Sequence, residues 1–213
     1  MNAFQDKVVL ITGAGKGAGR ELAKAFSMQG AVVAANDITP INLDSTIEAI
    51  QQNGGRAAAY VADVSKKMPV ETMVNQVLAD WDRIDILITN ARVEPRAAIL
   101  EMDEWAWKRT LGVNLTGAFL CLQVVGRVMA DAGQGVIVHI LQSGQPWENK
   151  AAAQASNAGL QALIAAAARE LEGFNIRVNG VMDNQTPGED LSHQVLTVCG
   201  PDEDHLCGQI LGL

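Results

Sequence analysis

The sequence predicts an α/β fold: a doubly wound parallel sheet of about seven strands with helices on both faces. Three observations predict it. Apolar runs of strand length recur along the chain, helix-length segments separate most of them, and 48% of the 213 residues are hydrophobic. We expect residues 1–213 to form one domain, because the chain can bury one large core but is short for two.

The elements follow from the spacing of apolar residues, with short runs as strands and longer segments as helices. The strands are predicted at residues 7–11, 31–36, 57–61, 84–89, 136–141 and 176–181, with a last one within 205–211. The helices are predicted at residues 18–29, 41–53, 69–81, 103–131, 151–173 and 191–198. Asp103 is expected to cap the fourth helix by accepting hydrogen bonds from its first turn.

Charge and cysteine content exclude several classes of protein. The formal charge of −8 and the pI near 4.8 predict repulsion from nucleic acid and from anionic membranes, so neither is an expected partner. Cys121, Cys199 and Cys207 lack CxxC spacing and the three histidines do not cluster, so no disulfide framework and no metal site are expected. We also expect no signal peptide, no membrane-spanning run and a cytoplasmic location.

The first expected strand runs directly into a glycine loop that opens a helix. Glycines let the backbone turn sharply and approach phosphates, and the free N–H groups of the helix supply hydrogen-bond donors. The loop therefore predicts a dinucleotide pyrophosphate site rather than an ordinary glycine-rich turn. Its residues are Gly13, Gly15, Lys16, Gly17, Ala18 and Gly19.

Read as Thr12-Gly13-x-x-x-Gly17-x-Gly19, the loop resembles that of the short-chain dehydrogenase/reductase family. The resemblance runs from about Phe4 to the C-terminus. Within the family, the chain is similar to the 3-oxoacyl carrier-protein reductase-like members. It implies a Rossmann fold and an NAD(P)-dependent oxidoreductase ancestry.

Two segments after the loop match the family's adenosine-binding positions. Asp37, followed by Ile38, closes the second strand where a carboxylate can accept hydrogen bonds from ribose hydroxyls and repel a 2′-phosphate. This favours NAD over NADP, although Lys16 favours a phosphate weakly, and an ordinary strand-end aspartate is the alternative. Asp63 and Val64 resemble the pair that contacts adenine, with helix capping as the alternative role for Asp63.

The next segment begins to depart from the family. Asn90 and Ala91 resemble the Asn-Asn-Ala-Gly turn beside the adenosine ribose, but Arg92 stands where that turn ends in glycine. Arg92 is therefore a candidate to block the cleft.

The resemblance also locates the proton relay, which in this family is an Asn, a Ser, a Tyr and a Lys. Asn114 matches the Asn, whereas Gln142, Ala153 and Asn157 occupy the Ser, Tyr and Lys positions. Ser143 lies one residue late, on the opposite face of its strand.

No other side chain is expected to replace the missing acid. The one tyrosine, Tyr60, lies at the adenosine end of the sheet, and His139 is expected to be structural. Asp183 and Asn184 replace the Pro-Gly pair that cradles the nicotinamide, and the substrate lid is shortened at about 184–191.

The predicted helix at 151–173 is rich in alanine and apolar nearly all round. Such a helix is either wholly internal or covered by a partner subunit. We expect the second case, a homodimer or homotetramer joined through helices 103–131 and 151–173.

Together these observations predict a non-catalytic member of the family that keeps its adenosine half, binds NAD or another adenine nucleotide weakly, and acts as a binding or regulatory protein. One alternative is an active NAD(P)-dependent reductase with an unorthodox relay that uses Ser143, water or Gln142. The other is a structural subunit in an oligomer with an active relative.

Overall fold

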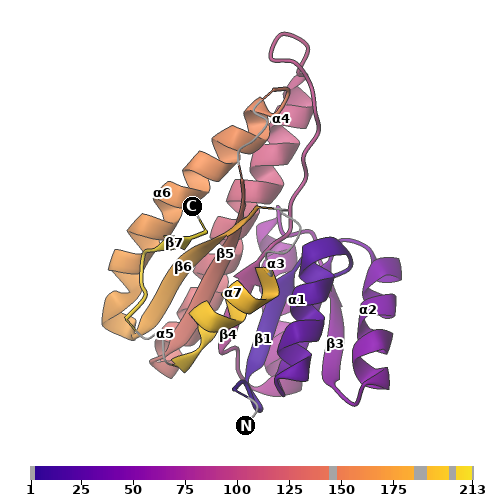
Figure 1. Ribbon diagram of the computed structural model, residues 1–213, viewed down its shortest axis with the longest axis vertical. Coiled ribbons are helices and arrows are strands. Elements are labelled where there is room, and N and C mark those ends of the chain that lie inside the picture. Colours follow the sequence, from indigo (N-terminus) through magenta and orange to yellow (C-terminus); the bar gives the residue numbers. More distant parts are fainter. Residues whose placement is uncertain (1–2, 144–147, 185–190, 202–204, 213) are drawn as a thin grey trace.

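The computed structural model describes residues 3–143, 148–184, 191–201 and 205–212 and confirms the predicted fold (Figure 1). Seven parallel strands form one sheet in the order β3-β2-β1-β4-β5-β6-β7. The strands are β1 Val8–Thr12, β2 Val32–Asp37, β3 Arg56–Val61, β4 Ile86–Thr89, β5 Gly135–Gln142, β6 Ile176–Asp183 and β7 Ile210–Leu211. The order reverses between β1 and β4, and such a switch point opens a crevice at the carboxyl ends of the strands.

Helices cover both faces of this sheet because the strand residues are apolar on both sides. Leu87 and Ile137 pack on one face with α3 (Lys67–Trp81), α5 (Ala118–Ala132) and α6 (Ala151–Leu171). Ile88 and Val138, one residue along in each strand, pack on the other with α1 (Gly17–Met28), α2 (Pro40–Gln52) and α7 (Leu191–Cys199). The near-continuous apolar strands of the sequence are therefore those of a sheet buried on both faces.

The helix predicted at 103–131 is one helical stretch of three parts. These are α4 (Glu104–Leu111), a π-helical turn (Gly112–Gly117) and α5. Asp103 caps α4 as predicted, because its Oδ1 accepts a hydrogen bond of 2.6 Å from the Ala106 backbone N–H.

The same stretch, Glu104–Ala132, is long and apolar enough by length and composition to cross a membrane, contrary to the sequence-based expectation. Buried core helices of water-soluble proteins have the same length and composition. Here 44% of the most apolar window is buried inside the protein.

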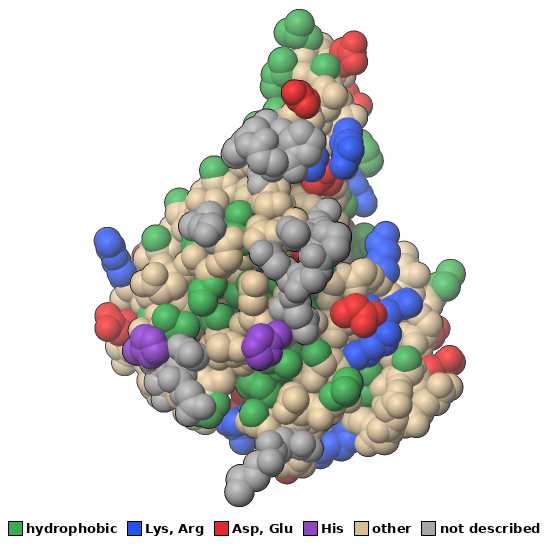
Figure 2. All heavy atoms as spheres, viewed as in Figure 1, with side chains coloured by type: hydrophobic (Ala, Val, Ile, Leu, Met, Phe, Trp, Pro, Cys, Tyr) green, Lys and Arg blue, Asp and Glu red, His purple; other side chains and the backbone are tan. Residues whose placement is uncertain are grey.

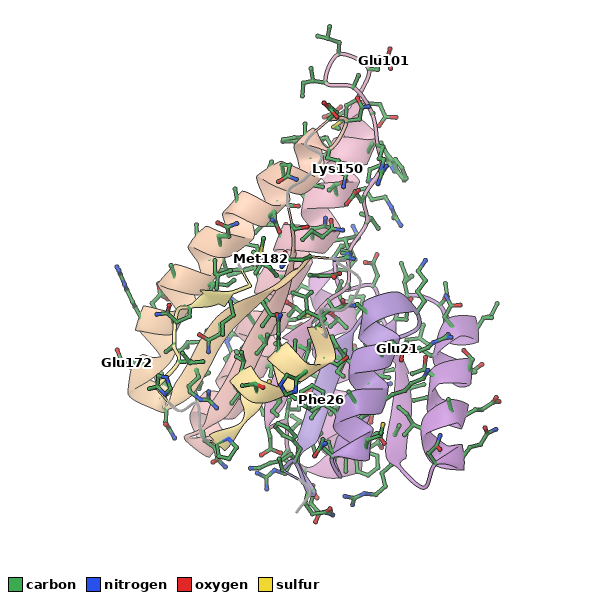
Figure 3. The ribbon with its side chains drawn as sticks, in the orientation of Figure 1. Glu21, Phe26, Glu101, Lys150, Glu172 and Met182 are labelled. Atoms are coloured by element: carbon green, nitrogen blue, oxygen red, sulfur yellow. The ribbon has the colours of Figure 1, made fainter. Side chains whose placement is uncertain are left out.

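A long connection between β4 and α4 projects beyond the sheet (Figure 1). Its tip exposes Ile99 and Leu100, and Figure 2 shows hydrophobic side chains there. Figure 3 places Glu101 at the same tip. The Ala97 N–H donates to the Asn149 carbonyl at 3.0 Å, so the base of the projection is tied to the segment that precedes α6.

The α6 helix is not wholly internal within the single chain. It buries Leu160 and Ile164 against the sheet but exposes Ala158, Ala162 and Ala165 on its outer side. A short 3₁₀ turn (Glu172–Phe174) follows it before β6.

Candidate functional site

The glycine loop lies between β1 and α1 at the switch point of the sheet, as the sequence predicts. Gly13 has φ +66°, in the left-handed region, and a Cβ added to Gly19 would collide with the Gly13 carbonyl oxygen. Both positions thus require glycine, because the start of α1 packs directly on the loop. Lys16, Gly17 and Ala18 line the cavity described below.

Arg20 holds the loop in place, which the sequence analysis missed. Its Nε donates to the Gly15 carbonyl and to Thr46 Oγ1 of α2, each at 3.1 Å, and its Nη2 donates to Ser45 Oγ at 2.8 Å. The buried Thr46 hydroxyl in turn donates to the Ala14 carbonyl at 3.1 Å. One available signal was a cation in the first turn of a helix, where the helix dipole disfavours positive charge.

The predicted ribose-binding carboxylate lies beside the loop. Asp37 accepts hydrogen bonds from the N–H groups of Gly15 at 3.1 Å and Ile38 at 2.7 Å. Both Asp37 and Ile38 line the cavity. The carboxylate is thereby fixed at the outer end of the crevice, where ribose hydroxyls could donate to it.

The sequence left two roles open for Asp63 and Val64, contact with adenine and capping of the next helix, and the structure assigns them to different residues. Asp63 Oδ1 accepts from the Ser65 N–H at 3.0 Å and from the Ser65 hydroxyl at 2.6 Å, so it organises the turn that leads to α3. Val64 lines the cavity and Asp63 does not.

Asn90 and Ala91 support the loop from the end of β4. The Asn90 side-chain amide donates to the carbonyls of Thr12 at 3.3 Å and Gly13 at 3.2 Å. The Thr12 hydroxyl accepts from the backbone N–H groups of Asn90 and Ala91. These contacts fix the floor of the crevice at the β1–β4 boundary.

The two departures from the family pattern at Arg92 and Asp183 meet in space. Arg92 Nη2 and Asp183 Oδ2 form an ion pair of 3.0 Å between the ends of β4 and β6. The Asp183 side chain is 11% exposed and that of Arg92 is 27% exposed. The pair therefore lies across the end of β5 in a largely desolvated position.

Asn114, the one relay residue that the sequence matches, lies in the π-helical turn. Its amide donates to the Val93 carbonyl at 3.0 Å and to Ser156 Oγ at 3.3 Å, and its Oδ1 accepts from the Val93 N–H at 2.9 Å. The residue fixes the chain that follows Arg92.

The residues at the Ser and Lys positions bind each other. The Asn157 amide donates to the Gln142 carbonyl at 2.8 Å, and its Oδ1 accepts from the Gln142 N–H at 3.2 Å. Ala153 is buried one turn earlier on α6. Gln142 lines the adjacent cavity but Ser143 does not, so the structure does not bring Ser143 to these positions.

Two cavities of different size share this crevice. A large cavity of about 470 Å³ extends from Asp37 past the glycine loop to Arg92 and Arg109. A small cavity of about 30 Å³ lies beyond it, lined by Asn114, Gln142, Ala153, Ser156 and Asn157 among others. Arg92 lines both cavities. The small one has room for about two water molecules.

An ion pair that the sequence analysis did not predict joins the connection between β4 and α4 to the residue that precedes α6. Lys150 Nζ is 3.0 Å from Glu94 Oε1, and both side chains are largely buried. Burial alone would raise the pKa of Glu94, but the hydrogen bond and charge of Lys150 and the charge of Arg96 outweigh it and lower that pKa. Figure 3 shows Lys150 at the base of the projecting connection, well separated from Met182 at the end of β6.

The remaining titratable candidates, Tyr60 and His139, do not line the small cavity, although Thr89, which His139 contacts, does. Tyr60 donates to Asp80 at 2.7 Å from edge strand β3, and burial and this hydrogen bond raise its pKa. His139 is fully buried, with Nδ1 2.5 Å from Thr89 Oγ1, and burial lowers its pKa to about 4.

Asn184 is at the edge of the described part of the chain and donates to the Gly212 carbonyl at 3.0 Å. The expected short lid falls mostly on residues 185–190, outside the described residues. Over the part of the chain that the structure describes, no three His, Cys, Asp or Glu side chains gather as metal ligands.

Comparison with known proteins places this geometry in context. The family model for short chain dehydrogenases matches residues 7–188. An uncharacterized oxidoreductase of Thermotoga maritima is 36% identical over 204 residues, which cover 94% of this chain and 80% of that protein. The 3-oxoacyl-acyl-carrier-protein reductase of the same organism is 30% identical, over 99% of this chain and 97% of that protein.

Solved structures agree with the sequence relatives. A short chain dehydrogenase from Mycobacterium smegmatis superposes with a TM-score of 0.92 at 26% identity, over 99% of this chain and 92% of that one. An NAD⁺-bound xylitol dehydrogenase superposes with a TM-score of 0.91 at 26% identity, over 98% of this chain and 97% of that one.

Proposed function

We propose a function from one premise: the chain belongs to the short-chain dehydrogenase family. This is a family of oxidoreductases that typically bind NAD(P). Within it, we propose that this chain binds an adenine nucleotide through the large cavity, catalyses no hydride transfer, and serves as a binding or regulatory protein.

The difference in size between the two cavities carries this proposal. The large cavity offers about 470 Å³ along the glycine loop and Asp37, whereas the cavity at the relay positions offers about 30 Å³. A nicotinamide and a substrate carbonyl need far more room than about two water molecules. The difference in volume therefore supports binding of an adenosine nucleotide and argues against a nicotinamide and a substrate at the relay positions.

The chemistry of the relay positions supports the same proposal. Proton transfer near neutral pH needs a group whose pKa is close to the working pH. Ala153 carries no such group, and the amide of Asn157 is engaged on the Gln142 backbone. Tyr60 is the only tyrosine and lies on β3, the edge strand farthest along the sheet from β6 and β7.

Asp37 supports NAD-type ligands over NADP-type ones. Its carboxylate is fixed by two backbone N–H groups at the end of β2, and a 2′-phosphate there would meet a negative charge. Lys16 lines the same cavity but does not remove that charge.

Calorimetric titration of the purified protein with NAD, NADH, AMP and ADP-ribose tests the proposal. We expect AMP and ADP-ribose to bind within about tenfold of NAD, because the lost contacts at the nicotinamide end are worth about 1 kcal/mol each. NADH binding more than about a hundredfold tighter than ADP-ribose would contradict this.

An active oxidoreductase is the second candidate, because relatives bear the names of dehydrogenases. One is the (2S)-[(R)-hydroxy(phenyl)methyl]succinyl-CoA dehydrogenase subunit of Thauera aromatica, which is 37% identical over 84% of this chain and 72% of that protein. Loss of NADH absorbance with small ketones and 3-oxoacyl thioesters distinguishes this candidate. We expect no turnover above background. Co-purification of a second dehydrogenase-like chain would instead support a structural subunit.

A further inference from the structure

Resting on the proposed function, we propose that the ligand is an adenosine nucleotide that ends in a free phosphate, of the ADP class, and that Arg92 binds this terminal phosphate. The proposal starts from the distribution of charge in the large cavity. Lys16, Arg92 and Arg109 line it, and Asp37 is the one acidic residue among its described lining residues. The cavity is thus cationic in a chain whose formal charge is −8.

The charges are also separated along the cavity. Asp37 is at the outer end, where two backbone N–H groups fix its carboxylate. Lys16 lies in the loop at the start of α1, Arg92 follows β4 on the opposite side of β1 from Asp37, and Arg109 lines the cavity from α4. A ligand that donates hydrogen bonds at one end and carries anionic oxygens toward the other matches this order. Adenosine diphosphate has that polarity.

Arg92 keeps a donor that no protein group uses. Its Nη2 is paired with Asp183, but its Nη1 is buried and has no hydrogen-bond partner. Among the described residues that line the two cavities, Arg92 is the only one with such a buried, unpartnered side-chain nitrogen or oxygen. Leaving a buried guanidinium N–H unpaired is costly, and a phosphate oxygen is a strong acceptor for it.

The small size of the cavity beyond Arg92 argues against a ligand that continues past its second phosphate. The small cavity beyond it measures about 30 Å³, and Arg92, which is paired with Asp183, lines both spaces. A nicotinamide riboside that displaced Arg92 would break this largely buried ion pair, and separating the partners of such a pair is costly. A nucleotide that ends at its second phosphate avoids this cost.

Calorimetry with ADP, AMP and NAD on the full-length protein and on Arg92→Ala tests the proposal. We expect the wild type to bind ADP at least about tenfold more tightly than AMP, and no less tightly than NAD, since a charge-assisted hydrogen bond has about that worth. Arg92→Ala should lose this preference for ADP while AMP affinity stays unchanged. Arg169→Ala, an exposed arginine on α6, is the matched control and should behave as wild type.

Arg92→Ala removes the ion pair with Asp183, and loss of this pair alone could disturb folding. A second variant, Asp183→Ala, therefore removes the same ion pair but keeps the Arg92 guanidinium. This second variant keeps Arg92, so it should bind ADP at least as tightly as wild type. The proposal is overturned if ADP and AMP bind equally to the wild type, if Arg92→Ala keeps the preference, or if Asp183→Ala loses ADP. If ADP, AMP and NAD all fail to bind, the proposed function itself fails; if all three bind equally, the proposed function stands and the role of Arg92 does not.

Discussion

The side chain of Asn157 holds the end of β5 through both atoms of its amide. One accepts from the Gln142 N–H and the other donates to the Gln142 carbonyl. A lysine at this position could donate to the carbonyl but could not accept from the N–H. Asn157 thus makes a structural contact worth about 1 kcal/mol that a lysine could not reproduce in full.

This contact shapes the outcome expected from restoring the relay with Gln142→Ser, Ala153→Tyr and Asn157→Lys together. The phenol at 153 must enter a cavity of about 30 Å³, and the Arg92–Asp183 pair remains in place. We expect a less stable protein with trace NADH oxidation at most, because a general acid contributes only when substrate and donor are aligned.

Absorbance at 340 nm with small ketones and 3-oxoacyl thioesters measures the restored variant, with the Asn157→Lys single variant as the control for stability. Turnover of about 1 s⁻¹, the low end of ordinary enzymes, would show that the nicotinamide and substrate sites are intact. That result would contradict the proposal of a non-catalytic protein.

At the scale of the element, α6 and α5 present an uncovered apolar surface. Leu115, Phe119, Gly159, Ala162 and Leu163 line a shallow groove between the helices, and Phe119 is 40% exposed. A helix with small apolar residues on its outer face gains stability when a second helix packs on it. We propose that two copies of the chain pair through this groove.

Ala162→Glu should therefore shift a dimer or tetramer toward monomer in sedimentation equilibrium at micromolar concentration. The charge would be buried without a partner at such an interface. Ala79→Glu, on the exposed side of α3, is the matched control and should leave the mass unchanged. A wild-type mass of 22.6 kDa, that of a single chain, would contradict the proposal.

The elements also show what the sequence could predict. The first six strands and the glycine loop are local patterns, so apolar runs and glycine spacing place them to within one or two residues, whereas the last strand is only the end of the predicted 205–211 segment. The π-helical turn has no such pattern, because residues 112–117 carry the same apolar spacing as the α-helical segments beside them.

Contacts between distant residues escaped prediction for a different reason. Arg92 and Asp183 are each visible in the sequence as departures from the family, but their pairing depends on β4 and β6 flanking β5. The Lys150–Glu94 pair likewise depends on how the projecting connection folds over the start of α6. Such pairings follow from tertiary structure, which periodicity does not encode.

At the scale of the whole molecule, His139 should make stability depend on pH. Burial lowers its folded pKa to about 4, below the ordinary value of 6.5, so the unfolded chain binds the proton more tightly. Stability is therefore full above pH 6.5 and falls as the pH drops toward 4. We expect the free energy of unfolding to fall by about 2 kcal/mol between pH 7 and pH 5 from this group alone.

Urea denaturation at the two pH values, on wild type and on His139→Asn, measures this contribution. The variant should lose about 2 kcal/mol of the pH dependence. His193→Asn, at an exposed histidine of α7, should retain it. An unchanged pH dependence in His139→Asn would show that other groups set the acid sensitivity.

The contacts of Arg20 have a consequence for the speed of binding. The glycine loop is fastened to α2 by side chains of the protein itself, through Arg20 and Thr46. A loop already in its final shape spends no ordering entropy when the ligand arrives. Diffusional encounter, rather than a slow closing of the loop, should then set the association rate. Differences in affinity among nucleotides should therefore come from their dissociation rates.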